Sequence, residues 1–304
     1  MDRAPIGVFD SGVGGLTVLR ELRARLPRED FLFVADQAHA PFGSRPMDEV
    51  LRLGFGIADF LLTAGSKLLV VACNTISAAA LQPLRKAHPG VPFVGMEPAV
   101  KPAAAETRNG VIGVIATEAT FQGELFAGAV DRFGRGVKVV TRTVPGLVER
   151  IERGETEGPD LETMLRERLA PLLKEGIDEL VLGCTHFPLA AGALQHVVGK
   201  DVRIIDPSPA VARRTEDLLR KRNLLNAEGG GRLCAYTSGD TERMALFLRR
   251  TLGVDAPVRR VEWTGGENPR LVESADAGGK QNGSTYRQPS PAGGGDGSCA
   301  GGLC

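Results

Sequence analysis

The stretch "LLVVACNTIS", residues 68–77, joins a run of large apolar residues to a cysteine, an asparagine and a threonine. A short apolar run without polar alternation is typical of a strand that is buried on both faces of a sheet. Eight further short runs share this character: "IGVFD", "DFLFVAD", "VPFVGM", "GVIGVIA", "VKVVTRTV", "ELVLGC", "VRIID" and "RLCAYTS". Amphipathic patterns such as "GLTVLRELRARL" separate several of them. The sequence therefore predicts an α/β fold with mainly parallel sheets flanked by helices.

Three blocks of the sequence recur later in the chain in the same order. "IGVFDSG" is answered by "IGVIATE", "LVVACNT" by "LVLGCTH", and "VGMEPAV" by "RIIDPSPAV", at a nearly constant offset. An ordered set of echoes indicates a duplication. The copies place Cys73 opposite Cys184 and Asp10 opposite Thr117. We expect two similar, pseudo-symmetric domains with an active site in the cleft between them, at the carboxyl ends of the strands.

The repeat also predicts the domain boundaries. We expect a first α/β domain formed by residues 1–97 together with 208–264, because the segment after the second copy carries one more helix and strand. The second α/β domain is expected over residues 98–207. Residues 265–304 are rich in glycine, serine and proline with few large apolar residues. Such a composition predicts a disordered tail.

Composition and charge exclude several classes of partner. The 37 basic and 37 acidic residues cancel, so no overall field draws the chain to nucleic acid or to a membrane surface, and a small-molecule ligand is expected. The five cysteines lack the spacing of a disulfide framework or a metal site. No apolar run reaches the roughly 18 residues of a membrane span, and the N-terminus lacks a signal-peptide pattern. We expect a cytoplasmic protein with free thiols.

The two strand-end cysteines allow two interpretations. A single buried cysteine is most often a small apolar filler, and Cys234 inside "RLCAYTS" fits that description. Cys73 and Cys184 differ because they stand at equivalent positions of the two copies, each leading into hydroxyl and amide residues where a helix is expected to begin. These matched positions favour a functional role for the two thiols over the filler interpretation.

Eight segments of the chain resemble the cofactor-independent aspartate/glutamate racemase family. They span roughly residues 5 to 264 in family order, and the paired "CNT" and "GCTHFPL" motifs are the most diagnostic of them. The segments read "FDSGVGGLTVLRELRARLP", "VADQAHAPFGSRP", "VVACNTISA", "MEPAVKPA", "VIGVIATEATFQ", "VERIERGE", "VLGCTHFPL" and "IIDPSPAVA".

The resemblance implies an isomerase that interconverts L- and D-glutamate and so supplies D-glutamate for peptidoglycan biosynthesis. It implies no pyridoxal phosphate, metal or nucleotide, and a pairing of two copies as a homodimer. Inversion of an α-carbon requires removal of a proton from one face and its return on the other. The resemblance assigns these steps to Cys73 and Cys184, with Asp10 serving Cys73, and His186 and Glu152 serving Cys184.

The resemblance also implies a set of substrate-binding residues. Their hydroxyl, amide and backbone N–H groups suit two carboxylates and an ammonium group. The set comprises Asp10, Ser11, Phe42, Gly43, Asn74, Thr75, Thr117, Thr120, Thr185 and His186. The family loop usually reads Pro-Tyr-Gly where this chain has Pro41-Phe42-Gly43, so a phenol hydroxyl is absent here. We expect activity to survive that change.

Several alternatives stay open at the level of sequence. A racemase for aspartate or another acidic amino acid fits the same residues, because they do not fix the distance between the two carboxylates. A non-catalytic two-lobed binding protein is a third reading, although binding alone needs no thiols. Asp10 can instead cap a helix, and Glu152 can belong to a solvated helix face.

Overall fold

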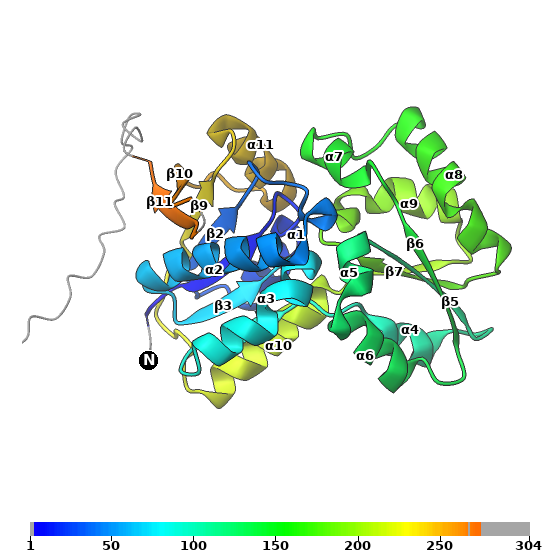
Figure 1. Ribbon diagram of the computed structural model, residues 1–304, viewed down its shortest axis with the longest axis horizontal. Coiled ribbons are helices and arrows are strands. Elements are labelled where there is room, and N and C mark those ends of the chain that lie inside the picture. The colour runs from blue at the N-terminus through cyan, green and yellow to red at the C-terminus, as the bar shows by residue number, and fades with distance from the viewer. Residues whose placement is uncertain (1–2, 267, 275–304) are drawn as a thin grey trace, which may run out of the picture.

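The fold was analysed in a computed structural model that describes residues 3–266 and 268–274. Two sheets lie side by side, each covered by helices on both faces (Figure 1). Apart from the antiparallel β10–β11 pair, all described strand pairs are parallel, which confirms the predicted α/β class with two parallel sheets. Over the described residues, no helix is both long and apolar enough to cross a membrane.

The first sheet has seven strands in the order β11-β10-β9-β2-β1-β3-β4. Its strands are β1 (Ile6–Asp10), β2 (Phe31–Ala35), β3 (Leu68–Val71), β4 (Phe93–Gly95), β9 (Leu233–Thr237), β10 (Val258–Thr264) and β11 (Arg270–Glu273). Its helices are α1 (Leu16–Arg25), α2 (Met47–Thr63), α3 (Asn74–Ala87), α10 (Ser208–Lys221) and α11 (Thr241–Leu252), with the 3-10 helix η1 (Phe42–Ser44).

The second sheet has four strands in the order β6-β5-β7-β8. Its strands are β5 (Val111–Ala116), β6 (Lys138–Thr143), β7 (Glu179–Gly183) and β8 (Arg203–Ile205). Its helices are α4 (Val100–Glu106), α5 (Glu118–Gln122), α6 (Glu124–Phe133), α7 (Leu147–Glu152), α8 (Pro159–Lys174) and α9 (Ala191–Val198), with the 3-10 helix η2 (Phe187–Ala190).

The two sheets repeat one topology. The order β2-β1-β3-β4 inside the first sheet matches β6-β5-β7-β8, with each strand replaced by the one four places later in the chain. The strands that carry the sequence echoes, β1 with β5, β3 with β7 and β4 with β8, therefore occupy equivalent places. The returning segment adds β9 beside β2. We propose the domain division 1–97 plus 208–264 and 98–207, because it agrees with the membership of every described strand except β11, which extends the first sheet beyond residue 264.

Burial explains why the strands read as continuous apolar runs. Along β3, Leu68 and Val70 pack with α1 and α10, whereas Leu69 and Val71 pack with α2 and α3. One core cluster extends from the α1 side of the first sheet to the α8 and α9 side of the second. The cores of both sheets are thus joined across their common boundary, which holds the carboxyl ends of β1, β3 and β7 in fixed relation.

The end of the first sheet differs from the sequence-based expectation. We expected residues 265–304 to be disordered, but Arg270–Glu273 form β11, which pairs with β10 in an antiparallel hairpin. Gly265 and Gly266 both have positive φ and allow the chain to turn after β10. Leu271 is buried against α2, and this burial stabilises a segment whose composition resembles a loop. The remainder of the expected tail, residues 275–304, lies outside the described residues.

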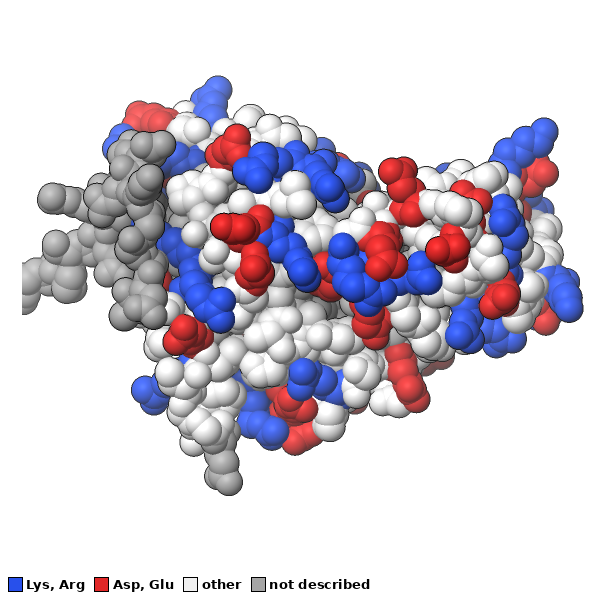
Figure 2. Space-filling model, turned by 90° about the horizontal axis from the view of Figure 1, so that it is seen from above, with Lys and Arg blue, Asp and Glu red and all other residues white. Residues whose placement is uncertain are grey.

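The charged surface matches the balanced composition. Seen from above, basic and acidic side chains alternate over both sheets, and neither sign dominates this face (Figure 2). Many charged side chains of the described residues form exposed pairs, such as Arg153 with Glu155 and Arg249 with Asp255. This face carries no single-sign field of the kind that nucleic-acid or membrane binding uses.

Candidate active site

Cys73 and Cys184 lie at the carboxyl ends of β3 and β7, and both line one small cavity between the two sheets. Six of the other lining residues come from the first sheet and its loops and four from the second. The complete lining is Ser11, Pro41, Phe42, Gly43, Cys73, Asn74, Thr75, Thr117, Val148, Cys184, Thr185 and His186. Because parallel strands end at one edge, the two copies of the fold bring their equivalent cysteines to a common space.

Cys73 is the N-cap residue of α3. Its Sγ accepts a hydrogen bond from the backbone N–H of Ile76 at 3.5 Å and donates one to Ser11 Oγ at 3.7 Å. Burial of the side chain, with the nearby charge of Asp10, raises the pKa of the Cys73 thiol well above its ordinary value. The N-terminal N–H groups of α3 oppose this shift only partly, so the environment favours the neutral thiol.

Asp10 ends β1 and is fully buried beneath the cavity. Its Oδ2 accepts a hydrogen bond from the backbone N–H of Gly15 at 2.6 Å. Burial raises the pKa of Asp10, although the positive charge of His186 partly offsets the effect. Gly15 is the N-cap of α1, so the helix-cap reading and the proximity to Cys73 both hold.

Cys184 is linked to a buried charged pair. Its Sγ lies 3.9 Å from His186 Nδ1, and the other ring nitrogen, Nε2, lies 2.6 Å from Glu152 Oε1. Burial would lower the pKa of His186, but the hydrogen bonds to Cys184 and Glu152 and the charge of Glu152 raise it well above its ordinary value. Burial would likewise raise the pKa of Glu152, but the hydrogen bond and charge of His186 lower it overall.

The expected helix start after Cys184 is wrong in detail. After Cys184 the chain passes through Thr185 and His186 into the 3-10 helix η2, and α9 begins only at Ala191. Pro188 sits at the start of η2, where a missing N–H is tolerated. Cys73 therefore faces the N-terminus of an α-helix, whereas Cys184 faces an imidazole. The two halves of the site are equivalent in topology but different in chemistry.

The polar wall of the cavity contains unused hydrogen-bonding capacity. Asn74 is 4% exposed, and neither its Oδ1 nor its Nδ2 has a hydrogen-bond partner within the described structure. Nearby, the hydroxyls of Thr75 and Thr117 are 3.0 Å apart, and Thr117 contacts Thr120 at 2.9 Å. A buried amide without partners is costly, so its place in the cavity wall points to a polar ligand there.

The glycine run "SGVGG" permits close contact between the two sheets. A Cβ on Gly12 would lie 1.9 Å from Glu152 Oε1, and a Cβ on Gly14 would lie 2.7 Å from the backbone nitrogen of His186. The backbone N–H of Val13, in the same loop, donates to Glu152 Oε1 at 2.8 Å. These glycines therefore allow the loop after β1 to pack directly on the Glu152–His186 pair.

The structure places most of the residues expected at the site in the cavity wall. The exceptions are Asp10, Thr120 and Glu152, which contact lining residues without being part of the lining. Glu152 is mostly buried and pairs with His186, so its alternative interpretation as a solvated helix residue is wrong. The sequence reasoning missed Val148 as a lining residue and Gln37, whose amide donates to Glu152 Oε2 at 3.0 Å.

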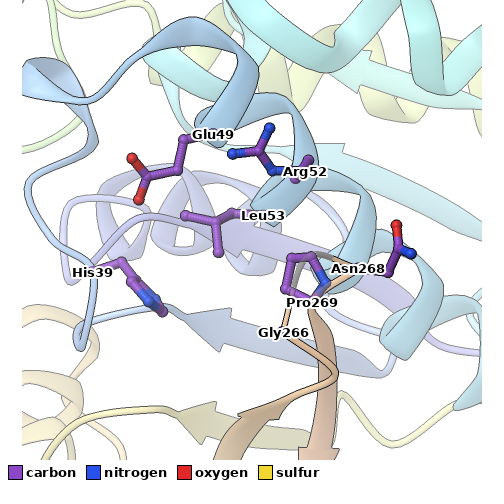
Figure 3. Close-up of a pocket in the computed structure, with 7 residues that line it drawn as sticks. All are labelled: His39, Glu49, Arg52, Leu53, Gly266, Asn268 and Pro269. Carbon is purple, nitrogen blue, oxygen red and sulfur yellow. The ribbon is translucent and has the colours of Figure 1, made fainter.

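A second, roomier cavity lies away from the thiols, between α2 and the β10–β11 hairpin (Figure 3). Its lining comes from α2 (Glu49, Arg52 and Leu53), from the loop after β2 (His39) and from the hairpin loop (Gly266, Asn268 and Pro269). His39 lies in the loop between β2 and η1, which leads to Phe42, and its Nδ1 lies 2.9 Å from Asp36 Oδ2. The described lining of this cavity contains no cysteine, so it lacks the paired groups of the site between the sheets.

The fold and the site together define a class of protein. Two parallel α/β sheets that hold one thiol each against a shared polar cavity are an arrangement for acid/base chemistry on both faces of a small molecule. This is the architecture of an amino-acid racemase.

The chain belongs to the Asp/Glu/Hydantoin racemase family, whose model matches residues 11–215. It is 49% identical over 261 residues to a protein of Roseiflexus sp. (strain RS-1) named glutamate racemase, covering 85% of this chain and 94% of that protein. Among solved structures, it is similar to glutamate racemase isoform RacE1 from Bacillus anthracis, with a TM-score of 0.78, 33% identity and coverage of 86% and 98%. It is also similar to Escherichia coli glutamate racemase in complex with L-glutamate and the activator UDP-MurNAc-ala, with a TM-score of 0.75, 30% identity and coverage of 84% and 97%.

Proposed function

We propose that this racemase interconverts L- and D-glutamate by a two-base mechanism in which Cys73 and Cys184 act on opposite faces of the α-carbon. The observation that carries the proposal is that the two strand-end thiols, one from each sheet, line a single cavity. Similarity to proteins named glutamate racemase, one of them solved with L-glutamate, supports the choice of substrate.

The two thiols are proposed to begin in different protonation states. The raised pKa of Cys73 favours its neutral form, whereas the imidazolium of His186 can donate a hydrogen bond to a thiolate at Cys184. In this resting state the Cys184 thiolate removes the α-proton and the Cys73 thiol returns one to the other face. The reverse reaction exchanges these roles. Asp10 then assists Cys73, and the pair of His186 and Glu152 assists Cys184.

Substrate binding is proposed to use the polar wall of the cavity. The unpartnered amide of Asn74, the hydroxyls of Ser11, Thr75 and Thr185, and the backbone N–H of Gly43 offer donors for two carboxylates. Thr117 shares this wall, and Thr120 acts through its hydrogen bond to Thr117. Phe42 is buried in the lining and contributes apolar contact in place of a phenol hydroxyl.

The proposed biological role follows from the product. D-glutamate made by this enzyme would supply peptidoglycan biosynthesis, a cytoplasmic process in its precursor stages, and we propose that the chain acts in that compartment. We further propose that it functions without pyridoxal phosphate, metal or nucleotide, and that two copies pair as a homodimer.

The test is to incubate the purified protein with L-glutamate in deuterated water and to follow optical rotation together with α-proton exchange by NMR. We expect complete loss of rotation and full incorporation of deuterium at the α-carbon, with L-aspartate reacting far more slowly. If neither amino acid exchanges its α-proton, the racemase proposal fails. Faster turnover of aspartate would change the proposed substrate while leaving the two-base mechanism in place.

A further inference from the structure

We propose that Gln37 is a positioning residue that holds Glu152, and through it the imidazole of His186, by tying this pair to the end of β9. The inference rests on the proposed racemase activity and concerns the half of the site that contains Cys184. Gln37 follows β2 in the first sheet, and Glu152 ends α7 in the second, so the contact joins the two sheets.

The hydrogen bonds form a continuous line. Gln37 Nε2 donates to Glu152 Oε2 at 3.0 Å, and Thr237 Oγ1 donates to Gln37 Oε1 at 2.8 Å. The backbone N–H of Gly239 donates to Thr237 Oγ1 at 2.9 Å and completes the line at its outer end. At its inner end, Glu152 Oε1 meets His186 Nε2, whose ring faces Cys184.

The chemistry of the donors fixes the orientation of the amide. An ionised Glu152 can only accept hydrogen bonds, so the NH₂ group of Gln37 must face it and Oε1 must face Thr237. The hydroxyl of Thr237 receives the Gly239 N–H and is left with its proton for Gln37. Each group in the line thus has one compatible role. Gln37 donates to Oε2 of Glu152, whereas Oε1 is shared by the His186 ring and the backbone N–H of Val13.

Packing keeps the line in place. Thr237 is fully buried, and a Cβ on Gly239 would lie 2.8 Å from Gln37 Cβ, so the glycine permits this close approach. Gln37 and Glu152 both line a third pocket, which is distinct from the cavity in Figure 3. Neither residue lines the cavity that contains the thiols. The charged groups around this pocket, besides Glu152 itself, are Glu149, Arg153, Asp240 and Arg243. Because Gln37 does not line the substrate cavity, its loss is expected to change kcat more than KM.

The principal variant is Gln37→Leu, which keeps the approximate shape of the side chain and removes both hydrogen bonds. A hydrogen bond to a charged group justifies an expected fall of kcat by about tenfold, with KM changed by less than about threefold. Since the equilibrium constant between enantiomers is one, kcat/KM must fall equally in both directions. The matched control is Gln195→Leu in α9, which removes the amide hydrogen bonds to Gly199 and Val202, lies outside the lining of the thiol cavity and should leave kcat unchanged.

Thr237 supplies a conservative pair of variants. Thr237→Val removes the hydroxyl that orients Gln37 and should lower kcat in the same way, whereas Thr237→Ser retains the hydroxyl and should retain the rate. If Thr237 had only a structural role, Thr237→Val and Thr237→Ser would not differ in kcat while sharing the same KM.

NMR titration of the His186 ring provides a readout that is independent of turnover. The protein contains four histidines, and loss of one signal in His186→Gln assigns the resonance. Because Glu152 raises the pKa of His186, a loosened Glu152 in Gln37→Leu should move the His186 midpoint to lower pH. An unchanged midpoint, an unchanged kcat, or an equal loss in Gln195→Leu would overturn the inference. Absence of racemisation by the wild-type chain would instead defeat the proposed function, and the titration would still test Gln37.

Discussion

At the scale of single residues, the site depends on two thiols with different surroundings. Cys73→Ser and Cys184→Ser should each reduce racemisation by at least about 10³-fold, because a serine hydroxyl is a far weaker acid and cannot exchange the proton at neutral pH. Steady-state polarimetry with circular dichroism measures activity and fold together. Cys234→Ser, in β9 and outside the cavity, is the control and should remain active. Full turnover by either active-site variant would contradict the two-thiol mechanism.

The sequence could predict this pair because each cysteine ends an apolar strand and the strands belong to a repeat. It could not predict Gln37 or Val148. Gln37 and Glu152 are 115 positions apart and meet only because the two sheets pack together. The only local sign was the position of Gln37 directly after a strand end. The difference in chemistry between the two thiols was also hidden, since it depends on burial and on which groups lie within hydrogen-bonding distance.

At the scale of elements, the β10–β11 hairpin is the part of the fold that sequence reasoning missed. Its strands are short, carry several charged residues and flank a loop of glycine, asparagine and proline, so neither apolar run nor regular alternation marked them. Burial of Leu271 and the hydrogen bond from Trp263 Nε1 to Asp36 at 2.8 Å fix the hairpin at the edge of the first sheet. Eight of the nine predicted strands, all but β6, are formed largely of apolar residues.

The hairpin offers a test with neighbouring residues on opposite faces. Leu271 is 5% exposed and Val272 is 41% exposed. Leu271→Ala should lower the free energy of unfolding by about 2–4 kcal/mol, because it removes buried methyl groups and leaves a cavity. Val272→Ala should change it by no more than about 0.5 kcal/mol. Urea denaturation of the two variants decides the matter, and equal effects would show that the hairpin does not pack as described.

At the scale of the whole molecule, the site exists because the loop after β1 fits against the second sheet. Gly14→Ala would place a methyl group against the backbone of His186 and should lower kcat by about tenfold or more and stability by about 1–3 kcal/mol. Gly128→Ala, in the interior of α6 where a Cβ meets open space, should instead stabilise the protein by about 0.5–1 kcal/mol. Polarimetry and thermal unfolding measure both variants; unaltered kinetics in Gly14→Ala would refute the close fit.

The path of the backbone between the two sheets has a mechanical consequence. Within residues 3–266 the chain leaves the first sheet after β4 and returns after β8, and each of these is the edge strand of its sheet. The two sheets with their helices are therefore covalently joined along one side only, which is the arrangement of a hinge. A rotation about that side would carry Cys73 with the cap of α3, and Cys184 with His186, as intact units. Such a rotation would also strain the hydrogen bonds that Gln37 and Val13 donate to Glu152 across the boundary, so these contacts limit how far the space between the two sulfurs can widen.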